Sequence, residues 1–258
     1  MSNINWGLLF YFDPATGESS PVPTPGAIGF PTYGHYGGGD YSAGAFGGAL
    51  LTKPDGSAYT YKQLVTLGDV LQDPVDKLDY LFYRHDVASA ESGPGYSNGQ
   101  AEADISLLQS LIKLDASYDP EASLYAGFAS LAMIGDLAIH NDLDLISPKL
   151  LLAGLKDAAG DIQYGLQHLS AQELTAAVSA GVLDPTGDPD VFAFNFSITT
   201  TTVAQESVEF IVMNALNAEL DLGESDYAPL NTGFPFPGTT DYQFTYDVVT
   251  HDLDLHTI

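Results

Sequence analysis

Three residues of this sequence have types and spacing suited to chemistry: His85, Asp86 and Asp104. The stretch "DPVDKLDYLFYRHDVASA" (residues 73–90) predicts a helix capped by Asp73. Its apolar residues recur at helical spacing, which places His85 on the inward face and Asp86 beside that face. The stretch "QAEADISLLQSLIKL" (residues 100–114) predicts a second helix with Asp104 on its apolar face, where a carboxylate is costly unless it has a partner. Because the loop between them is short, we expect an antiparallel helix pair in which His85 and Asp104 lie level.

An imidazole held by a buried carboxylate is an oriented general base, which can take a proton from water. A His–Asp bond that only joins two helices is the other interpretation, and the residues alone leave both open. The pKa of an unperturbed histidine is about 6.5. Burial lowers that pKa and the Asp104 carboxylate raises it, so we expect His85 to be neutral between about pH 7 and 8.

The stretch "YGHYGGGDYSAG" (residues 33–44) contains five glycines, which lose much backbone freedom on folding. A glycine-rich loop can turn several backbone carbonyls toward one point, because few Cβ atoms obstruct it. Ca²⁺ takes about six to eight oxygen ligands, and Asp86 could supply one of them. A loop that only makes a tight bend, with no ligand, is the alternative.

Together these stretches resemble the calcium-dependent secreted phospholipase A2 family, including its cysteine-free parvovirus-like variants. The resemblance covers residues 30–115, and "PVDKLDYLFYRHD" is its most specific part. It is carried by Tyr33-Gly34-x-Tyr36-x-Gly38, Pro74-Val75-Asp76-x-Leu78-Asp79, His85-Asp86 and Asp104.

The resemblance implies calcium-dependent hydrolysis of the sn-2 ester of a phospholipid, at a membrane or micelle surface. It makes His85 the general base that activates water, Asp104 the carboxylate that orients it, and Asp86 the side-chain calcium ligand. It also gives roles to the glycine-rich loop. The Gly38 N–H would donate a hydrogen bond to the oxyanion, and the carbonyls of Tyr36, Gly38 and Asp40 would be calcium ligands. Calcium would polarise the ester carbonyl and hold the phosphate.

The sequence departs from the family pattern at several positions. His35 and Gly37 stand where the family has loop cysteines, and the disulfide frame is absent. Asp40 replaces a glycine, and Ser89 replaces a tyrosine of the network that orients the base. The segment 48–64, in which Pro-Asp-Gly predicts a hairpin, separates the loop from the helix.

The fold class predicted is α+β, predominantly α, with a glycine-rich loop, additional helices and short strands. Further helices are expected at residues 120–141, 147–159, 170–181 and 203–220. Alternating patterns predict strands at residues 6–12, 192–198 and 241–258. We divide the chain into a phospholipase A2-like part (residues 1–115) and a helical, then α/β part (residues 116–258), which could share one core.

Seven Lys or Arg stand against 34 Asp or Glu, for a formal net charge of −27. Nucleic acid is therefore excluded as a partner, because phosphate binding needs a basic face. Such acidity suits either a highly solvated surface or an environment rich in divalent cations. No apolar run reaches the length of a transmembrane segment, and the N-terminus lacks the basic head of a Sec-type signal peptide. We expect a secreted protein, since the C-terminal "LDLHTI" is similar to type I export signals.

Three alternatives remain open from the sequence. The C-terminal "THDLDLH" (residues 250–256) could place metal ligands on one strand face, although a solvated polar face fits the pattern better. An HD-type metal phosphohydrolase would need His140 with Asp136 or Asp142 near His85. A non-enzymatic, calcium-stabilised binding or surface module would keep the helix pair only as a scaffold. The oligomeric state is open.

Overall fold

The computed structural model describes residues 3–13, 18–25, 27–70, 72–92, 96–140, 142–185, 191–200, 238–247 and 253–257. Side chains are described up to Leu183, Pro148 excepted. This part of the chain is mixed α+β with helices dominant, as predicted, and its sheets are small and antiparallel. The predicted division of the chain at residue 115 remains a prediction.

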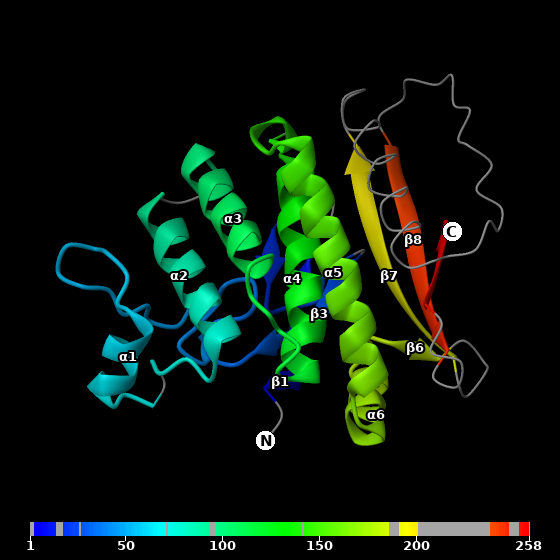
Figure 1. Cartoon of the computed structure of the whole chain (residues 1–258), viewed down its shortest axis with the longest axis horizontal. Helices are drawn as coiled ribbons and strands as arrows, with labels where there is room; N and C mark the ends of the chain where they lie inside the picture. Colours follow the sequence, from blue (N-terminus) through cyan, green and yellow to red (C-terminus); the bar gives the residue numbers. More distant parts are fainter. Residues whose placement is uncertain are drawn as a thin grey trace.

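The helices form the larger layer of the molecule, and α2 to α5 stand side by side in Figure 1. Their bounds are α1 (Tyr61–Leu67), α2 (Lys77–Glu91), α3 (Asn98–Leu111), α4 (Pro120–Ile139), α5 (Pro148–His168) and α6 (Ala171–Ser179), with a 3₁₀ turn η1 (Leu143–Leu145). The predicted helices between residues 73 and 181 are confirmed, and α5 continues beyond its predicted end at residue 159. The predicted helix at residues 203–220 lies outside the described residues.

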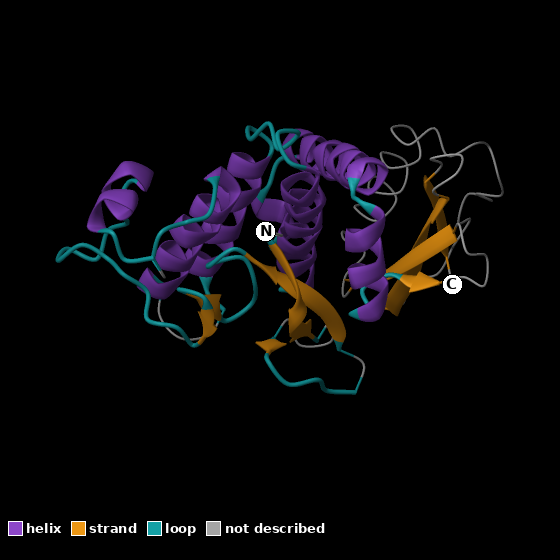
Figure 2. Cartoon of the chain, turned by 90° about the horizontal axis from the view of Figure 1, so that it is seen from below, coloured by secondary structure: helices purple, strands orange, loops and turns teal. Residues whose placement is uncertain are grey.

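The strands form three antiparallel sheets. The first, of order β2-β1-β3, consists of β1 (Ile4–Phe12), β2 (Ser19–Ser20) and β3 (Ile28–Tyr33); the second pairs β4 (Tyr41–Ser42) with β5 (Ala45–Phe46). The third, of order β6-β7-β8-β9, consists of β6 (Asp184–Pro185), β7 (Val191–Thr200), β8 (Gly238–Asp247) and β9 (Leu253–Thr257). The strands predicted near both ends of the chain are confirmed. In Figure 2 the strands next to the N-terminus lie below the helices.

The hairpin predicted at residues 48–64 is wrong. Pro-Asp-Gly makes only a local turn, in which the Gly56 N–H donates to the Lys53 carbonyl over 2.9 Å, and no strands flank it. The chain instead enters α1, whose N-terminus is closed by a capping box between Thr60 and Gln63. Two reciprocal hydrogen bonds that satisfy free N–H groups therefore start a helix where the sequence analysis expects a strand.

Helix α4 is the central element of the core. Asp119 caps it and Pro120 occupies its first turn. It packs closely on α5, because a Cβ at Gly127 would lie 2.6 Å from a side-chain carbon of Ile162. By length and composition alone α4 could cross a membrane, but 67% of its most apolar stretch is buried within the protein. Core helices pass the same test, so the expectation of no transmembrane segment stays a prediction.

Aromatic packing fixes the first sheet and the start of the glycine-rich loop against the helices. The Tyr33 ring, at the end of β3, lies 6.2 Å from that of Phe82 on α2 and 4.9 Å from that of Tyr125 on α4. The Tyr125 hydroxyl donates to the Pro31 carbonyl over 3.0 Å. The buried Glu121 carboxylate accepts the Asn3 N–H at 2.5 Å, which fixes the start of β1 to α4. The glycine-rich loop therefore leaves β3 at a defined position beside α2.

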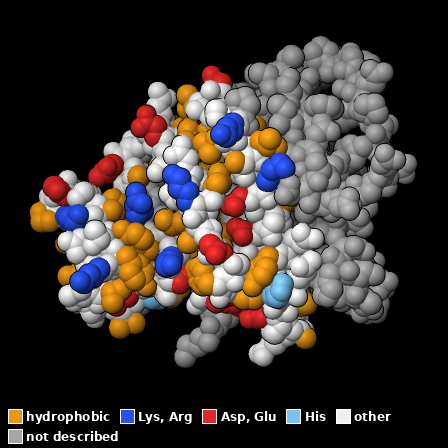
Figure 3. Space-filling model, viewed as in Figure 1, with side chains coloured by type: hydrophobic (Ala, Val, Ile, Leu, Met, Phe, Trp, Pro, Cys, Tyr) orange, Lys and Arg blue, Asp and Glu red, His pale blue; other side chains and the backbone are white. Residues whose placement is uncertain are grey.

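The net charge of −27 is unevenly distributed. All seven Lys and Arg residues fall between positions 53 and 156, and the last 102 residues contain none. Figure 3 shows Lys and Arg side chains spread among hydrophobic ones over the helical face. That face is therefore less acidic than the composition of the whole chain implies.

Candidate functional site

Helix α2 carries most of the candidate site and begins later than predicted. Its N-cap is Asp76, not Asp73, and the Asp76 side chain accepts the Asp79 N–H at 2.8 Å. The same carboxylate accepts the hydroxyls of Tyr33 and Tyr118, at 2.5 and 2.9 Å. The N-terminus of α2 is thus tied both to the start of the glycine-rich loop and to the segment that precedes α4.

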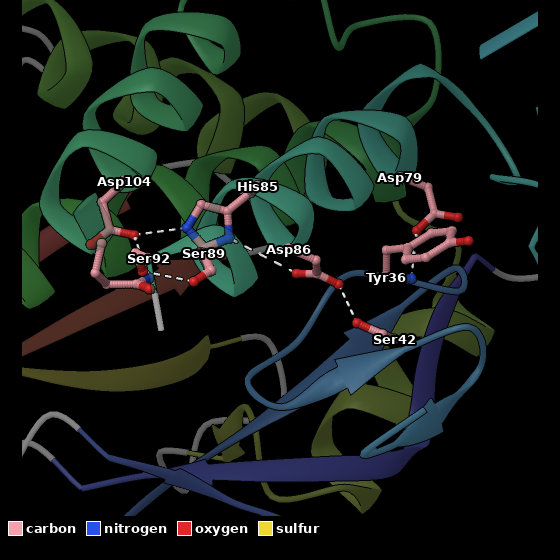
Figure 4. A network of polar contacts seen from close by, with 9 residues as sticks. Tyr36, Ser42, Asp79, His85, Asp86, Ser89, Ser92 and Asp104 are labelled. Carbon is pink, nitrogen blue, oxygen red and sulfur yellow. Dashed lines mark hydrogen bonds and ion pairs between the residues drawn. The ribbon is translucent and has the colours of Figure 1, made fainter. Parts of the chain in front are cut away.

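His85 on α2 and Asp104 on α3 are in direct contact, as Figure 4 shows. The His85 Nε2 atom lies 2.7 Å from Asp104 Oδ1, which also accepts the Gln100 side-chain amide at 3.3 Å. The Asp104 side chain is 1% exposed and that of His85 is 16% exposed. Since a carboxylate only accepts, Nε2 carries the hydrogen and Nδ1 is the nitrogen left to exchange protons.

Asp86 lies between His85 and the glycine-rich loop (Figure 4). Its Oδ2 accepts the hydroxyl of Ser42 from β4, while its Oδ1 is 3.9 Å from His85 Nδ1. That distance is too long for a hydrogen bond, so Asp86 does not engage His85 Nδ1 directly. Burial raises the pKa of Asp86, which the contacts with His85 and Ser42 partly oppose. The approach of Ser42 to Asp86 was not predicted.

The electrostatics of His85 differ from the sequence-based expectation. Burial lowers its pKa, but the hydrogen bond to Asp104 and the contact with Asp86 outweigh burial and raise the pKa to about 9. The expectation of a neutral imidazole between about pH 7 and 8 weighed only Asp104 against burial. A second carboxylate next to the ring favours the imidazolium form.

Asp79 on α2 holds the glycine-rich loop and is the main site residue that the sequence analysis missed. It is fully buried, and it accepts the N–H groups of His35, Tyr36 and Val75 at 2.8 to 3.1 Å. Burial raises the pKa of Asp79 to about 7, although these backbone hydrogen bonds lower it in part. A Cβ at Gly34 would lie 2.4 Å from Asp79 Cγ, so this glycine lets the backbone approach the carboxylate. The sequence did contain a signal for Asp79: it precedes Asp86 by two helical turns, so both carboxylates lie on the same face of the helix.

The loop carbonyls predicted to bind calcium differ in whether they already accept a backbone hydrogen bond. The Gly38 carbonyl accepts the Tyr41 N–H at 3.3 Å, and the Asp40 carbonyl accepts the Gly47 N–H at 2.8 Å. Neither the Tyr36 carbonyl nor the Gly38 N–H has a backbone hydrogen bond among the described residues. Asp40 adopts a positive φ of 55°, uncommon outside glycine, where the family pattern has glycine.

The oxygen atoms around the Asp86 carboxylate are of the type and charge that a hard cation binds. Asp86 and the Ser42 hydroxyl already meet there, and the Asp40 carboxylate is close enough to raise the pKa of Asp86. Calcium binds such carboxylate, hydroxyl and carbonyl oxygens. The described residues contain no group of three or more His, Cys, Asp or Glu that could hold a metal ion. A site there would therefore depend on backbone carbonyls for most of its ligands.

The remaining candidates have different outcomes. Ser89 stands where the family pattern has a tyrosine, but its buried Oγ has no hydrogen-bond partner among the described residues, so it takes no part in orienting His85. His140 Nε2 lies 3.6 Å from Asp136 Oδ1, but this pair joins no metal cluster there, and the HD-type alternative gains no support. The side chains of the C-terminal cluster at residues 250–256 lie outside the described residues.

Comparison of the chain with protein-family models, with curated proteins and with solved structures finds no match.

Proposed function

We propose that this chain is a calcium-dependent lipolytic enzyme, similar to the secreted phospholipase A2 family, that hydrolyses the sn-2 ester of phospholipids. The observation that carries the proposal is the continuous contact from Asp104 through His85 and Asp86 to Ser42 (Figure 4). It joins an oriented imidazole to a carboxylate beside a glycine-rich loop. The two halves of such a hydrolytic site, a base for water and oxygens for a cation, thus share one helix.

In this proposal His85 Nδ1 takes a proton from the attacking water. Asp104, 2.7 Å from Nε2, holds the ring in the tautomer that leaves Nδ1 available and stabilises the imidazolium that forms. The His85 side chain is 16% exposed, so solvent reaches part of it. His85 is the general base, and Asp104 orients it.

The cation site consists of the Asp86 side chain, the Ser42 hydroxyl and the carbonyls of Tyr36, Gly38 and Asp40. When bound, calcium polarises the ester carbonyl, binds the phosphate and opposes the imidazolium form of His85 by its charge. The Gly38 N–H, without a backbone acceptor among the described residues, supplies a donor for the developing oxyanion. A secreted location, where calcium is abundant, is part of the same proposal.

One observation favours the second candidate, a non-enzymatic module stabilised by calcium. The carboxylates of Asp104 and Asp86 raise the pKa of His85 to about 9, which favours the imidazolium form at pH 7, and that form cannot accept a proton. In a module that state would be permanent, and the His85–Asp104 bond would serve only to join α2 to α3. In the enzyme the charge of a cation held at Asp86 would lower that pKa.

Fatty-acid release from a mixed-chain phosphatidylcholine, with excess calcium and with chelator, separates the two candidates. The enzyme releases only the sn-2 chain, and only with calcium. A module binds calcium and gains thermal stability from it, but it releases no fatty acid at any calcium concentration. Release that persists in chelator, or of the sn-1 chain, contradicts the proposed function.

A further inference from the structure

The second carboxylate oxygen of Asp104 lacks a donor. Its Oδ1 is engaged by the side chains of His85 and Gln100, whereas Oδ2 is buried and has no hydrogen-bond partner among the described residues. The whole residue is only 1% exposed. A buried carboxylate oxygen without a hydrogen-bond donor is destabilising, so this arrangement calls for a donor at Oδ2.

The group that faces Asp104 from the neighbouring helix is a second acid, Asp136 on α4. The two carboxyls are close enough for a hydrogen bond between them. Two ionised carboxylates cannot bond, since each only accepts, and their like charges repel. A hydrogen bond between them therefore requires one proton.

The other groups around Asp136 do not supply a cation that would keep it ionised. His140 Nε2 is 3.6 Å away, but burial lowers the pKa of His140, and the Tyr96 ring is stacked on it at 3.6 Å. Asp142, at the start of η1, adds further negative charge. His85 lowers the pKa of Asp136 by its charge, but less than burial and Asp104 raise it, and its Nε2–H is already bonded to Asp104.

We propose that Asp104 and Asp136 share one proton, and that the protonated Asp136 donates to Asp104 Oδ2 and thereby positions the His85 imidazole. The proton comes from solvent, and no bond other than this O–H is made. Burial and the nearby Asp104 charge raise the pKa of Asp136 to about 8, in agreement with a proton held at neutral pH. The role toward His85 rests on the proposed function, whereas the shared proton does not. Asp136 is a positioning residue, because it acts through Asp104.

Infrared difference spectra test the shared proton without any activity. The spectrum of the parent at pH 7 minus that of Asp136→Asn is expected to contain the C=O band of a protonated carboxylic acid. In the Asp104→Asn background the same subtraction is expected to lose that band, because Asp136 then ionises. Asp144→Asn, at an exposed position of η1, is the matched control and is expected to leave the band unchanged. A parent spectrum in which Asp136 contributes only an ionised carboxylate band overturns the proposal.

Kinetics then test the positioning role. Asp136→Leu removes the donor and is expected to lower kcat by about 10- to 100-fold with KM unchanged, as for the loss of a hydrogen bond to a charged group. Asp136→Asn is expected to restore most of that rate, since an amide N–H can donate to Asp104 Oδ2. An Asp136→Leu variant as fast as the parent overturns the positioning role. If the parent itself releases no fatty acid, the proposed function fails, and the infrared result still decides on the shared proton.

Discussion

Helix α2 carries two aspartates that both contact the glycine-rich loop, Asp79 and Asp86, and their surroundings differ sharply. Asp79 is fully buried, and its two oxygens accept backbone N–H groups from three residues. Asp86 is 17% exposed and meets a side-chain hydroxyl and the edge of an imidazole. Seven residues, or two helical turns, separate them, so both face the loop.

The difference separates a structural carboxylate from one that can bind a ligand. Backbone N–H groups are fixed in place, so Asp79 cannot exchange them for a cation without dismantling the loop. The Ser42 hydroxyl can rotate, so Asp86 can keep its place while it accepts a new partner. One aspartate therefore shapes the loop, and the other remains free to act. The predictions below test this distinction, from the largest expected effect to the smallest.

Asp86→Asn is expected to abolish calcium-dependent fatty-acid release and to weaken calcium binding while the fold is kept. The amide has nearly the volume of the carboxylate and can still accept from Ser42, but it lacks the charge that a hard cation needs. Titration calorimetry and circular dichroism measure the two outcomes. Unchanged calcium affinity in this variant removes Asp86 from the site.

His85→Gln is expected to lower the rate of hydrolysis by about 10²- to 10⁴-fold, the usual contribution of a positioned general base. Calcium affinity is expected to persist, because His85 contacts water and not the ion. Asp104→Asn is expected to cost less than His85→Gln, since it removes orientation and leaves the base. Near-parent hydrolysis by His85→Gln would falsify the mechanism and favour the module.

Asp79→Ala is expected to lower the free energy of unfolding by about 3 kcal/mol, because backbone N–H groups of three residues lose their buried acceptor. Urea unfolding measures the loss. Asp144→Ala, at an exposed position, is the control and is expected to change stability by less than about 0.5 kcal/mol. A loss at Asp79 no larger than that of the control would mean that Asp79 does not hold the loop.

Gly34→Ala and Gly68→Ala form a matched pair, since both glycines have positive φ, 53° and 68°. At Gly68, the C-cap of α1, an added Cβ meets nothing within 4 Å, so only the backbone conformation opposes alanine, at about 1 kcal/mol. At Gly34 the Cβ would also strike Asp79 Cγ at 2.4 Å. Thermal unfolding is expected to show a clearly larger loss for Gly34→Ala. Equal losses would mean that Asp79 can move away from the loop.

Much of this arrangement is local in the sequence and could be predicted. Apolar periodicity located α2 and α3, and it placed His85 and Asp104 on their inward faces. Two local errors have identifiable causes. At residues 48–64 the Pro-Asp-Gly turn was given more weight than the capping-box spacing of Thr60 and Gln63. Asp73 was taken as the cap of α2, whereas the Asp76 carboxylate accepts both the Asp79 N–H and the Tyr33 hydroxyl.

The contacts that decide the chemistry lie far apart in the chain and left no local signal. Ser42 meets Asp86 across 44 positions, and Asp136 reaches Asp104 from a separate helix. The pKa of His85 depends on the sum of such contacts, so an estimate from Asp104 alone placed it too low. Helical spacing predicts which face a residue occupies, but packing decides which groups meet there.

The last expected effect is a change in the pH dependence of stability. Burial raises the pKa of Asp79 from 3.8 to about 7, so the folded chain keeps a proton that the unfolded chain releases within that window. The free energy of unfolding is therefore expected to fall as pH rises from about 4 to about 7. The stabilisation that comes from the proton on Asp79 is complete below about pH 4 and is lost above about pH 7. Asp79→Asn cannot titrate, so its stability is expected to depend less on pH over this window.

Urea midpoints of the parent and of Asp79→Asn, measured across the same pH range, test how steeply the free energy of unfolding falls with pH. Other buried acids titrate identically in both proteins, so the difference between the two curves isolates Asp79. Asp86→Asn is the matched comparison, and its curve is expected to stay closer to that of the parent, because Asp86 keeps partial contact with solvent. Parallel curves for the parent and Asp79→Asn would mean that Asp79 is ionised throughout. Its backbone donors would then outweigh burial, and the contrast with Asp86 would lie in hydrogen bonding alone.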